Sequence, residues 1–269
     1  MEISKQIKLL IKKYAIYPSK QLGQNFLISS DALRFIQNAV DPVTDKTYIE
    51  IGAGFLFCTM LVAEKSKEVI AIEKDKRFIP YYNEIVHPRI KIVIDDALKI
   101  DFSRYGVTEA FGNIPYNISS PLILKLANTN TVKRTILLLQ KEFARRILAV
   151  PDNKDYGAIT IFADFFFEKK FLKTFPPHFF YPMPSVSSTL IELKRREVLP
   201  DVNKSILFRI VRGAFSQRRK TLFNALKRDF NVVQLKKAFA DAGLPLNIRG
   251  ESLSLNDFLK IAKWFEKHL

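Results

Sequence analysis

The segment FGNIPYNISSP, residues 111–121, combines groups that can present hydrogen-bond acceptors to a ligand in a fixed geometry. An apolar stretch ends at Asn113 and continues through Ile114, Pro115 and Tyr116. Pro115 fixes its own φ and restrains Ile114 to an extended conformation. The Asn113 amide, the carbonyls beside it and the Tyr116 ring are therefore held in one arrangement. We interpret this corner as a segment stiffened to contact a ligand.

Three other polar features recur upstream at intervals of about twenty residues. The sequence EIGAG supplies Gly52 and Gly54, Glu73 follows 21 residues after Gly52, and Asp96 lies in the sequence DDA. Glycines let backbone approach a ligand closely, and a carboxylate in the second position can accept both ribose hydroxyls. Taken one at a time, each feature has a simpler explanation: the glycine pair is typical of a turn, Glu73 of a solvated charge, and Asp96 of a helix N-cap. Together they predict a nucleoside held across successive strand ends.

Two nucleoside cofactors, NAD and S-adenosylmethionine, fit this pattern, and the corner at 113–116 favours the second. The third glycine of the dinucleotide fingerprint is absent, since Leu56 and Phe57 fill that region. No side chain is placed as a proton relay for hydride transfer. The exocyclic amine of adenine is planar and weakly nucleophilic. Acceptors such as the Asn113 side-chain oxygen and the Ile114 carbonyl would favour its pyramidal form, while Tyr116 stacks on the base.

These residues must be positioned by strands that alternate with helices. Short apolar runs predict strands, and the polar residues named above follow them directly. The runs lie in TYIEIGAG (47–54), EVIAIEKD (68–75), IKIVIDDAL (90–98), EAFGNIPY (109–116) and RTILLLQKEFARRILAV (134–150), the last of which is expected to be a strand and then a helix. Such runs between helical patterns indicate a parallel sheet covered on both faces. Ligands bind outside the carboxyl ends of the strands in sheets of this type.

The remaining segments complete a two-domain interpretation. Residues 1–14 read as a basic amphipathic helix, and the next helix is expected to have Ser30 or Asp31 as its N-cap. Later strands are expected in AITIFADFFFEKKFLKTF (158–175) and SSTLIELKRR (187–196). Helical patterns dominate after about residue 203. We therefore expect an α/β domain at 1–198, with 1–18 as an N-terminal basic helical extension, and a small basic all-helical domain at 199–269.

The charge of the chain points to nucleic acid. Its 269 residues include 43 Lys and Arg against 27 Asp and Glu, a net charge of +16. Residues 201–269 contain 14 basic and 6 acidic side chains (+8), and residues 1–200 contain 29 and 21 (+8). The last quarter thus carries half of the excess, which favours a polyanionic partner over a merely lysine-rich surface. Phosphate contacts are expected from Arg212, Arg218, Arg219, Lys220 and Lys227.

Several other classes are disfavoured. No apolar run approaches the roughly 20 residues of a membrane span, and the lysine-rich start has no signal-peptide pattern, so a cytoplasmic protein is expected. The single cysteine, Cys58, excludes internal disulfides. The three histidines lie far apart without partners at metal-ligand spacing, so no metal site is expected.

The sequence resembles the ribosomal small-subunit RNA adenine dimethyltransferases. The stretches that carry this resemblance occur in order and span residues 19–254: SKQLGQNFL, EIGAG, NIPYNISSP, LQKEFARR, FYPMPSV, FSQRRKTLFNAL and RGESLS. The first domain alone is similar also to the macrolide-resistance methylases of large-subunit RNA. Pro121 and the sequence QRRKTLFNAL favour the small-subunit family. The resemblance implies a Rossmann-like S-adenosylmethionine-dependent methyltransferase sheet followed by the helical domain.

The resemblance also implies residue roles. Tyr116 and Phe180 would sandwich a target adenine flipped out of its stack. The catalytic set would be Asn113, Ile114, Pro115, Tyr116 and Phe180. The residues binding S-adenosylmethionine would be Gln24, Asn25, Leu27, Gly52, Gly54, Glu73, Lys74, Asp96, Ala97 and Asn113. Leu56, Cys58 and Ala158 depart from the residues found in many relatives and could alter cofactor affinity.

The expected activity is dimethylation of the N6 amines of two adjacent adenines near the 3′ end of small-subunit RNA. The expected partner is that RNA in an assembling subunit, and the protein is expected to be a monomer that binds no membrane. Two alternatives remain. One is methylation of large-subunit RNA, and the other is a non-catalytic RNA-binding assembly factor on the same fold.

Overall fold

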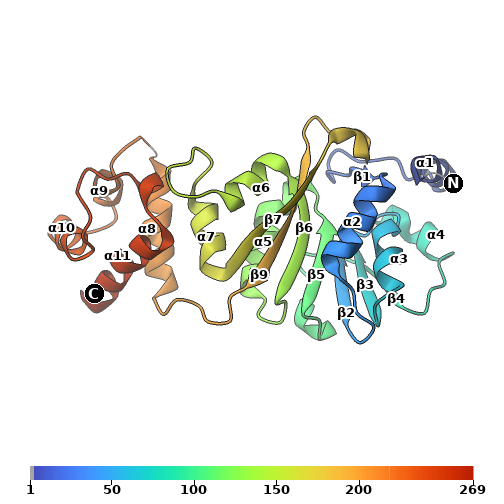
Figure 1. The fold of residues 1–269 in the computed structure, drawn as a ribbon, viewed down its shortest axis with the longest axis horizontal. Coiled ribbons are helices and arrows are strands. Elements are labelled where there is room, and N and C mark those ends of the chain that lie inside the picture. Colours follow the sequence, from blue (N-terminus) through green and yellow to red (C-terminus); the bar gives the residue numbers. More distant parts are fainter. Residues whose placement is uncertain (1–2, 218, 269) are drawn as a thin grey trace. The chain divides into compact units, whose positions relative to one another are not determined.

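The computed structural model describes residues 3–217 and 219–268, and contacts divide the chain into two compact units (Figure 1). The first, here called the sheet unit, consists of Met1–Ala144 and Lys169–Arg195. The second, the helical unit, consists of Arg145–Glu168 and Arg196–Leu269. Residues 145–168 thus group with the C-terminal residues by contacts. The expected boundary after residue 198 divides the chain by function, and it stays a prediction.

A seven-stranded sheet forms the centre of the sheet unit, with the order β4-β3-β2-β5-β6-β9-β7. Strands β2 to β6 run parallel to one another, and β9 pairs antiparallel with β6. The strands are β2 (Thr47–Ile51), β3 (Glu68–Glu73), β4 (Ile90–Ile94), β5 (Glu109–Asn113), β6 (Arg134–Gln140), β7 (Phe167–Phe175) and β9 (Ser188–Arg195). This α/β architecture confirms the fold class expected from the alternating apolar runs.

The strand order reverses beside β2, which lies between β3 and β5. The register pairs Ile51 with Ile72 and Glu73 with Ile94, so the carboxyl ends of β2, β3 and β4 lie at one edge of the sheet. Asn113 ends β5 at the same edge, opposite Leu138 of β6. A reversal of strand order at the carboxyl edge is the place where open parallel sheets bind ligands.

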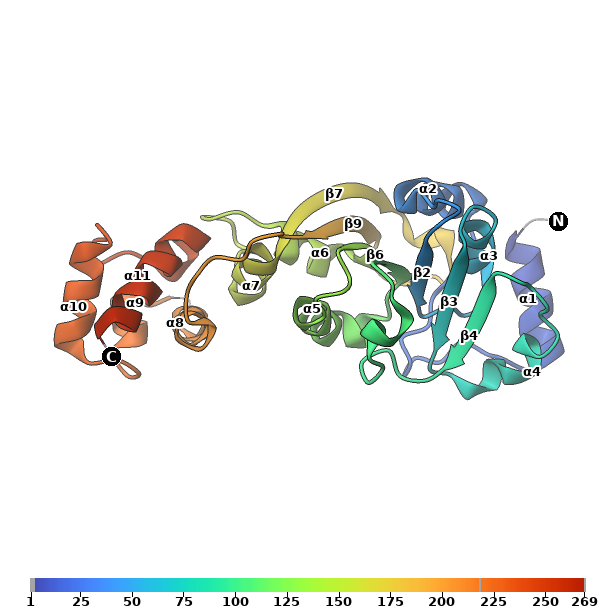
Figure 2. The same ribbon diagram turned by 90° about the horizontal axis from the view of Figure 1, so that it is seen from below.

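Helices cover both faces of this sheet. Helices α2 and α3 lie on one face and α5 on the other (Figure 2). Helix α2 begins at Ser30 with Ser29 as its N-cap, whose hydroxyl accepts a hydrogen bond from the Ala32 amide; the expectation of Ser30 or Asp31 was wrong by one residue. The helices and short 3-10 turns of this unit are α1 (Ile3–Tyr14), α2 (Ser30–Val40), α3 (Phe57–Ala63), η1 (Lys76–Phe78), α4 (Ile79–Tyr82), η2 (Phe102–Tyr105), η3 (Tyr116–Ile118), α5 (Ser119–Asn128) and η4 (Pro177–Phe179), with α6 (Lys141–Leu148) leading out of it.

A separate two-stranded ribbon joins the loop before α2 to the proline-rich segment. Strand β1 (Phe26–Leu27) pairs antiparallel with β8 (Phe180–Tyr181), so that Leu27 faces Phe180. Both side chains are buried in a core cluster that includes Leu33, Phe111 and Phe175. This pairing fixes one end of the loop that precedes α2.

The strand expected over 158–175 is in fact a helix followed by a strand. Residues Ala158–Phe166 form α7, and only Phe167–Phe175 form β7. The helix is buried on several sides, since Thr160, Ile161, Ala163 and Phe165 are fully buried. A helix without a polar face shows no helical period in its sequence, which explains the wrong prediction.

The helical unit packs α7 with the C-terminal helices. Phe208 of α8 contacts the rings of Phe162, Phe165 and Phe166 of α7. Its elements are α7 (Ala158–Phe166), α8 (Lys204–Ser216), α9 (Leu222–Leu226), α10 (Val232–Asp241), η5 (Gly250–Ser252) and α11 (Leu255–His268). The helical character expected after residue 203 is therefore confirmed. Within the described residues of both units, each helix falls short of the length and apolarity that crossing a bilayer requires.

Candidate functional site

A cavity opens at the carboxyl ends of β2 to β5, all within the sheet unit. Most of the expected site residues line it together. They are Gln24, Asn25, Gly52, Gly54, Glu73, Lys74, Asp96, Ala97, Asn113, Ile114, Pro115 and Tyr116.

The Asn113 side chain is fixed at the rim of this cavity. Its Nδ2 donates a hydrogen bond to the main-chain oxygen of Asn25 at 2.8 Å. Among the described residues, none donates to its Oδ1. The geometry therefore orients Asn113 so that its acceptor, and not its donor, is available to a ligand.

The Pro115 corner is held by main-chain hydrogen bonds on both sides. The Ile114 amide donates to the Leu138 carbonyl at 3.0 Å, and the Pro115 carbonyl accepts from the Ile118 amide at 3.1 Å. The Ser119 hydroxyl also donates to the Pro115 carbonyl, at 3.3 Å. These contacts use the Pro115 oxygen, which leaves Ile114 as the neighbouring residue whose carbonyl can be offered to a ligand.

Tyr116 lines the cavity beside this corner. Its ring is half-buried, and its hydroxyl lies 3.4 Å from the Ser188 hydroxyl of β9. The aromatic face is thus anchored at its polar tip, which suits stacking of a planar group against it.

Two glycines allow backbone segments to meet at the cavity. At Gly23, φ is +62°, and a Cβ would lie 3.3 Å from both the Pro115 Cβ and the Tyr116 nitrogen. At Gly52, φ is +79°, and a Cβ would lie 3.4 Å from the Asn113 carbonyl. A side chain at either position would be strained by the positive φ and would crowd the corner.

Glu73 is buried at the end of β3, 8% exposed, with its carboxylate held by main chain. Oε2 accepts from the Gly54 amide and Oε1 from the Asp75 amide, both at 2.9 Å. Burial raises the pKa of Glu73, although the two amides favour its charged form. Each oxygen keeps a lone pair, so the carboxylate can accept further hydrogen bonds from a ligand.

Asp96 is the acceptor that follows β4. Its Oδ1 accepts from the Leu98 amide at 2.9 Å, and its Oδ2 lies 2.9 Å from the Lys74 ammonium. Partial burial opposes ionisation, but the contacts with Lys74 and Leu98 outweigh it and lower the pKa of Asp96. Lys74 is therefore an ion-pair partner of Asp96.

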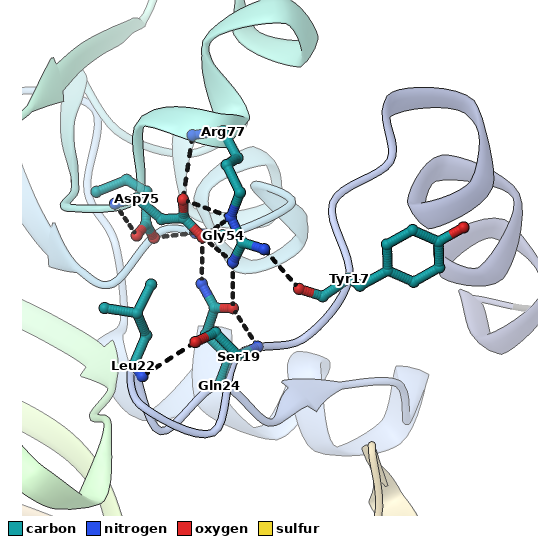
Figure 3. A network of polar contacts seen from close by, with 8 residues as sticks. Tyr17, Ser19, Leu22, Gln24, Gly54, Asp75 and Arg77 are labelled. Carbon is teal, nitrogen blue, oxygen red and sulfur yellow. Dashed lines mark hydrogen bonds and ion pairs between the residues drawn. The ribbon is translucent and has the colours of Figure 1, made fainter.

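Gln24 lines the cavity, but its amide belongs to a network that the sequence did not indicate (Figure 3). Its Nε2 donates to Asp75 Oδ2 at 2.8 Å, and its Oε1 accepts from the Ser19 amide at 2.9 Å. The amide head of Gln24 is thus occupied within the protein.

Two expected site residues lie elsewhere. Leu27 borders a smaller adjoining cavity that shares Gly52 and Asn113 with the first one. Phe180 is 2% exposed and packs in the core. Its expected contact with a base would require the ring to become exposed, and that role stays a prediction.

The structure also adds lining residues that the sequence analysis missed. Gly23 lies in the sequence QLGQNFL, and its isolation in a polar loop was the available signal. The added residues are Leu22, Gly23, Phe26, Ile51, Ile72, Asp95, Asn117 and Ile118. Apart from Ile72, they lie within the stretches SKQLGQNFL, EIGAG, DDA and NIPYNISSP, so the motifs marked the segments but not these individual residues.

The basic residues expected to contact phosphate belong to the helical unit. Arg212, Arg219, Lys220 and Lys227 are all exposed, and Arg218 lies outside the described residues. Across residues 3–217 and 219–268, no three His, Cys, Asp or Glu side chains converge in a way that could hold a metal ion.

Comparisons with known proteins agree with the fold and with the motifs. The family model described as ribosomal RNA adenine dimethylase matches residues 18–267. Ribosomal RNA small subunit methyltransferase A of Clostridium perfringens is 37% identical over 273 residues, covering 97% of this chain and 95% of that protein. The protein of the same description from Listeria innocua is 35% identical over 280 residues, covering 97% and 95%.

Among solved structures, a dimethyladenosine transferase from Plasmodium falciparum matches with a TM-score of 0.76 and 27% identity, over 90% of this chain and 98% of that one. The 23S rRNA methyltransferase ErmE matches with a TM-score of 0.69 and 23% identity, over 90% and 100%. At that identity, the second likeness shows the fold alone.

Proposed function

The chain belongs to the ribosomal RNA adenine dimethylase family, and from this premise we propose that it dimethylates adenine N6 amines in ribosomal RNA with S-adenosylmethionine. The substrate proposed is a pair of adjacent adenines near the 3′ end of small-subunit RNA, within an assembling subunit. A protein that modifies RNA in an assembling subunit is expected to be located where ribosomal subunits assemble, which for this protein we expect to be the cytoplasm.

The residues around the cavity fit S-adenosylmethionine. Gly52 and Gly54 present close backbone, and the Glu73 and Asp96 carboxylates follow adjacent strands. We assign Glu73 to the ribose hydroxyls, Asp96 to the adenine amine, and the backbone at Gly52 to the methionine part. When bound, the cofactor supplies a methyl group on a sulfonium.

The observation that carries the proposal is the orientation of Asn113. Because Nδ2 is bonded to Asn25, Oδ1 is the atom left to face a ligand. We assign Oδ1 and the Ile114 carbonyl as acceptors for the two hydrogens of the target amine. These contacts favour a pyramidal nitrogen and free its lone pair for attack. The proton then leaves to solvent.

The target base needs a stacking surface once it has left the RNA. Tyr116 supplies one, since its ring lines the cavity next to Asn113. We assign Phe180 to the opposite face of the base, with the condition that its ring leaves the core when RNA binds. The exposed basic side chains Arg212, Arg219, Lys220 and Lys227 are assigned to RNA phosphates.

The choice of the small subunit is supported by the names of the relatives in Clostridium and Listeria. The test is to incubate the purified protein with unmodified small and large ribosomal subunits and labelled S-adenosylmethionine, then to locate the label by mass spectrometry. We expect dimethyladenosine in small-subunit RNA only. Label confined to large-subunit RNA would overturn the substrate, and no cofactor binding in calorimetry would favour a non-catalytic assembly factor.

A further inference from the structure

One wall of the cavity is a loop with little support of its own. Residues 22–26 contribute lining atoms, and the preceding residues form a turn closed by three hydrogen bonds. The Gly23 and Gln24 amides donate to the Lys20 and Ser19 carbonyls, each at 3.1 Å, and the Leu22 amide lies 3.4 Å from the Ser19 hydroxyl. Segments with so few buried contacts open at low free-energy cost. Their closed position requires a contact from outside the loop.

Asp75 and Arg77, on the turn that follows β3, provide such contacts (Figure 3), in addition to the hydrogen bonds that Asn117 Nδ2 donates to the Gln21 carbonyl at 3.1 Å and Asn113 Nδ2 donates to the Asn25 carbonyl at 2.8 Å. The Asp75 carboxylate accepts from Gln24 Nε2 at 2.8 Å. Arg77 donates from Nη1 to the Tyr17 carbonyl at 3.0 Å and from Nη2 to Gln24 Oε1 at 3.3 Å. Two residues from the sheet edge therefore hold the loop at both Tyr17 and Gln24.

Asp75 and Arg77, together called the clasp, also form a forked ion pair with each other. Arg77 Nε lies 2.9 Å from Asp75 Oδ1, and Arg77 Nη2 lies 2.6 Å from Asp75 Oδ2. The Asp75 side chain is 5% exposed and the Arg77 side chain 44% exposed. Planar two-point pairing of this kind fixes direction as well as charge. The buried carboxylate depends on Arg77 and Gln24 for its hydrogen bonds.

Asp75 connects this clasp to the site itself. Its amide donates to Glu73 Oε1 at 2.9 Å, while the other Glu73 oxygen is held by Gly54. The loop, the clasp and the proposed ribose-binding carboxylate therefore form one continuous network. A closed loop and an oriented Glu73 are coupled through a single residue.

We propose that Asp75 and Arg77 are positioning residues that clasp residues 17–25 over the cavity, and that this closure sets cofactor affinity more than the rate of methyl transfer. The identity of the cofactor rests on the proposed function. The closure of the loop by the clasp does not, and it can be tested without any ligand.

The ligand-free test is limited trypsin digestion at Lys20, which is exposed in the loop. The variant is Arg77→Gln, followed by mass spectrometry of the large fragment that begins at Gln21. Arg104→Gln is the matched control, because Arg104 follows Asp101 on a similar aspartate-capped turn and pairs with it on the surface. We expect Arg77→Gln to speed cleavage after Lys20 at least about fivefold and Arg104→Gln to leave it unchanged.

The second test measures S-adenosylmethionine binding by calorimetry and transfer at saturating cofactor. Arg77→Gln is expected to weaken binding about tenfold, with kcat within about twofold of the parent, because uniform binding is lost. Arg77→Lys keeps the positive charge but loses the forked guanidinium, so its affinity for S-adenosylmethionine should lie between those of Arg77→Gln and the parent. If Arg77→Gln left cleavage at Lys20 unchanged, or lowered kcat without changing the affinity for S-adenosylmethionine, the proposed role of the clasp would be overturned. If the parent protein binds no S-adenosylmethionine, the proposed function fails, while cleavage at Lys20 still decides whether the clasp holds the loop.

Discussion

The Asn113 side-chain nitrogen and the Asn25 main-chain oxygen are joined by a 2.8 Å hydrogen bond that spans 88 residues of sequence. The bond ties the Pro115 corner to the loop that lines the same cavity. It also decides which end of the Asn113 amide is presented to a ligand. The corner and the loop thus depend on each other for their orientation.

Replacing Asn113 by Ala or Asp is expected to lower methyl transfer by about 10²–10³-fold, the usual loss when one oriented polar group is removed. Asp would also set a carboxylate against the Asn25 carbonyl. Single-turnover transfer to small subunits is the measurement. Asn128→Ala serves as the control, because Asn128 is an exposed amide whose Nδ2 donates to the Leu124 carbonyl. Transfer retained in Asn113→Ala would remove the role assigned to this side chain.

The second prediction concerns the role of Phe180 in stacking on the target base. Phe175 is the matched control, since both rings are buried in the same core cluster. Replacing either ring by Leu is expected to cost similar stability, below about 2 kcal/mol. If Phe180 stacks on the base, only Phe180→Leu should slow transfer, by roughly tenfold for a stacking contact of 1–3 kcal/mol. Transfer rates per folded molecule decide this. Equal rates in the two variants would leave Phe180 as a core residue only.

Glu50 predicts a pH-dependent stability. The side chain is 3% exposed at the end of β2 and accepts a hydrogen bond from Thr59. Burial raises the pKa of Glu50 from 4.5 to about 8, although Thr59 opposes the shift. Between these two values the folded state holds a proton that the unfolded state has lost. The contribution of Glu50 to the free energy of unfolding therefore falls as pH rises through this window.

Glu50→Gln removes this titration while keeping an acceptor for Thr59. We expect the variant to gain stability relative to the parent between about pH 5 and about pH 8, by more than about 1 kcal/mol. Urea unfolding at both pH values measures the difference. A difference that does not change with pH would show that Glu50 does not titrate in this range.

Leu56 adopts a left-handed conformation, with φ at 61°, and its side chain is fully buried. The strain costs about 1–2 kcal/mol, and burial of the side chain contributes about 2–5 kcal/mol, so burial dominates. Both Leu56→Ala and Leu56→Gly should lower stability. Glycine should be the better replacement by about 1 kcal/mol, because it relieves the strain. At Leu33 in α2, which is buried in a regular helix, alanine should be the better one. If glycine and alanine ranked in the same order of stability at both sites, the backbone strain inferred at Leu56 would be contradicted.

The basic residues of the helical unit predict a salt-dependent affinity. Replacing Arg219 and Lys220 by Ala should reduce the slope of log affinity against log salt by roughly 1.4–1.8, since each phosphate contact contributes about 0.7–0.9. Lys236 and Lys237 of α10, also exposed, give a control with the same loss of charge. Filter binding to small-subunit RNA over a range of salt measures both. If the two double variants showed equal slopes, RNA affinity would depend on the overall charge of the protein and not on phosphate contacts by Arg219 and Lys220.

Sequence reasoning reached the parts of the site that a local pattern marks. Each strand that ends at the cavity was an apolar run, and the polar residue after it had to lie at the carboxyl edge because parallel strands share that edge. Pro115 similarly fixed its corner through local sterics. The helix over Ala158–Phe166 was missed because its two polar residues, Thr160 and Asp164, are too few to mark a polar face in a largely apolar segment. The N-cap of α2 was missed because three polar residues in a row, Ser29, Ser30 and Asp31, offer equivalent caps.

By itself, then, the sequence determined the alternating sheet, the polar residues that stand at its strand ends and the basic character of the C-terminal helices. Tertiary structure alone decided that Asn113 turns its oxygen outward, that Phe180 packs in the core, and that Arg77 reaches Tyr17 and Gln24 across more than fifty residues. The physical reason is that local sterics and hydrophobic period act between neighbours in the chain. The direction of a side chain depends instead on which distant donors and acceptors the fold brings within about 3 Å of it.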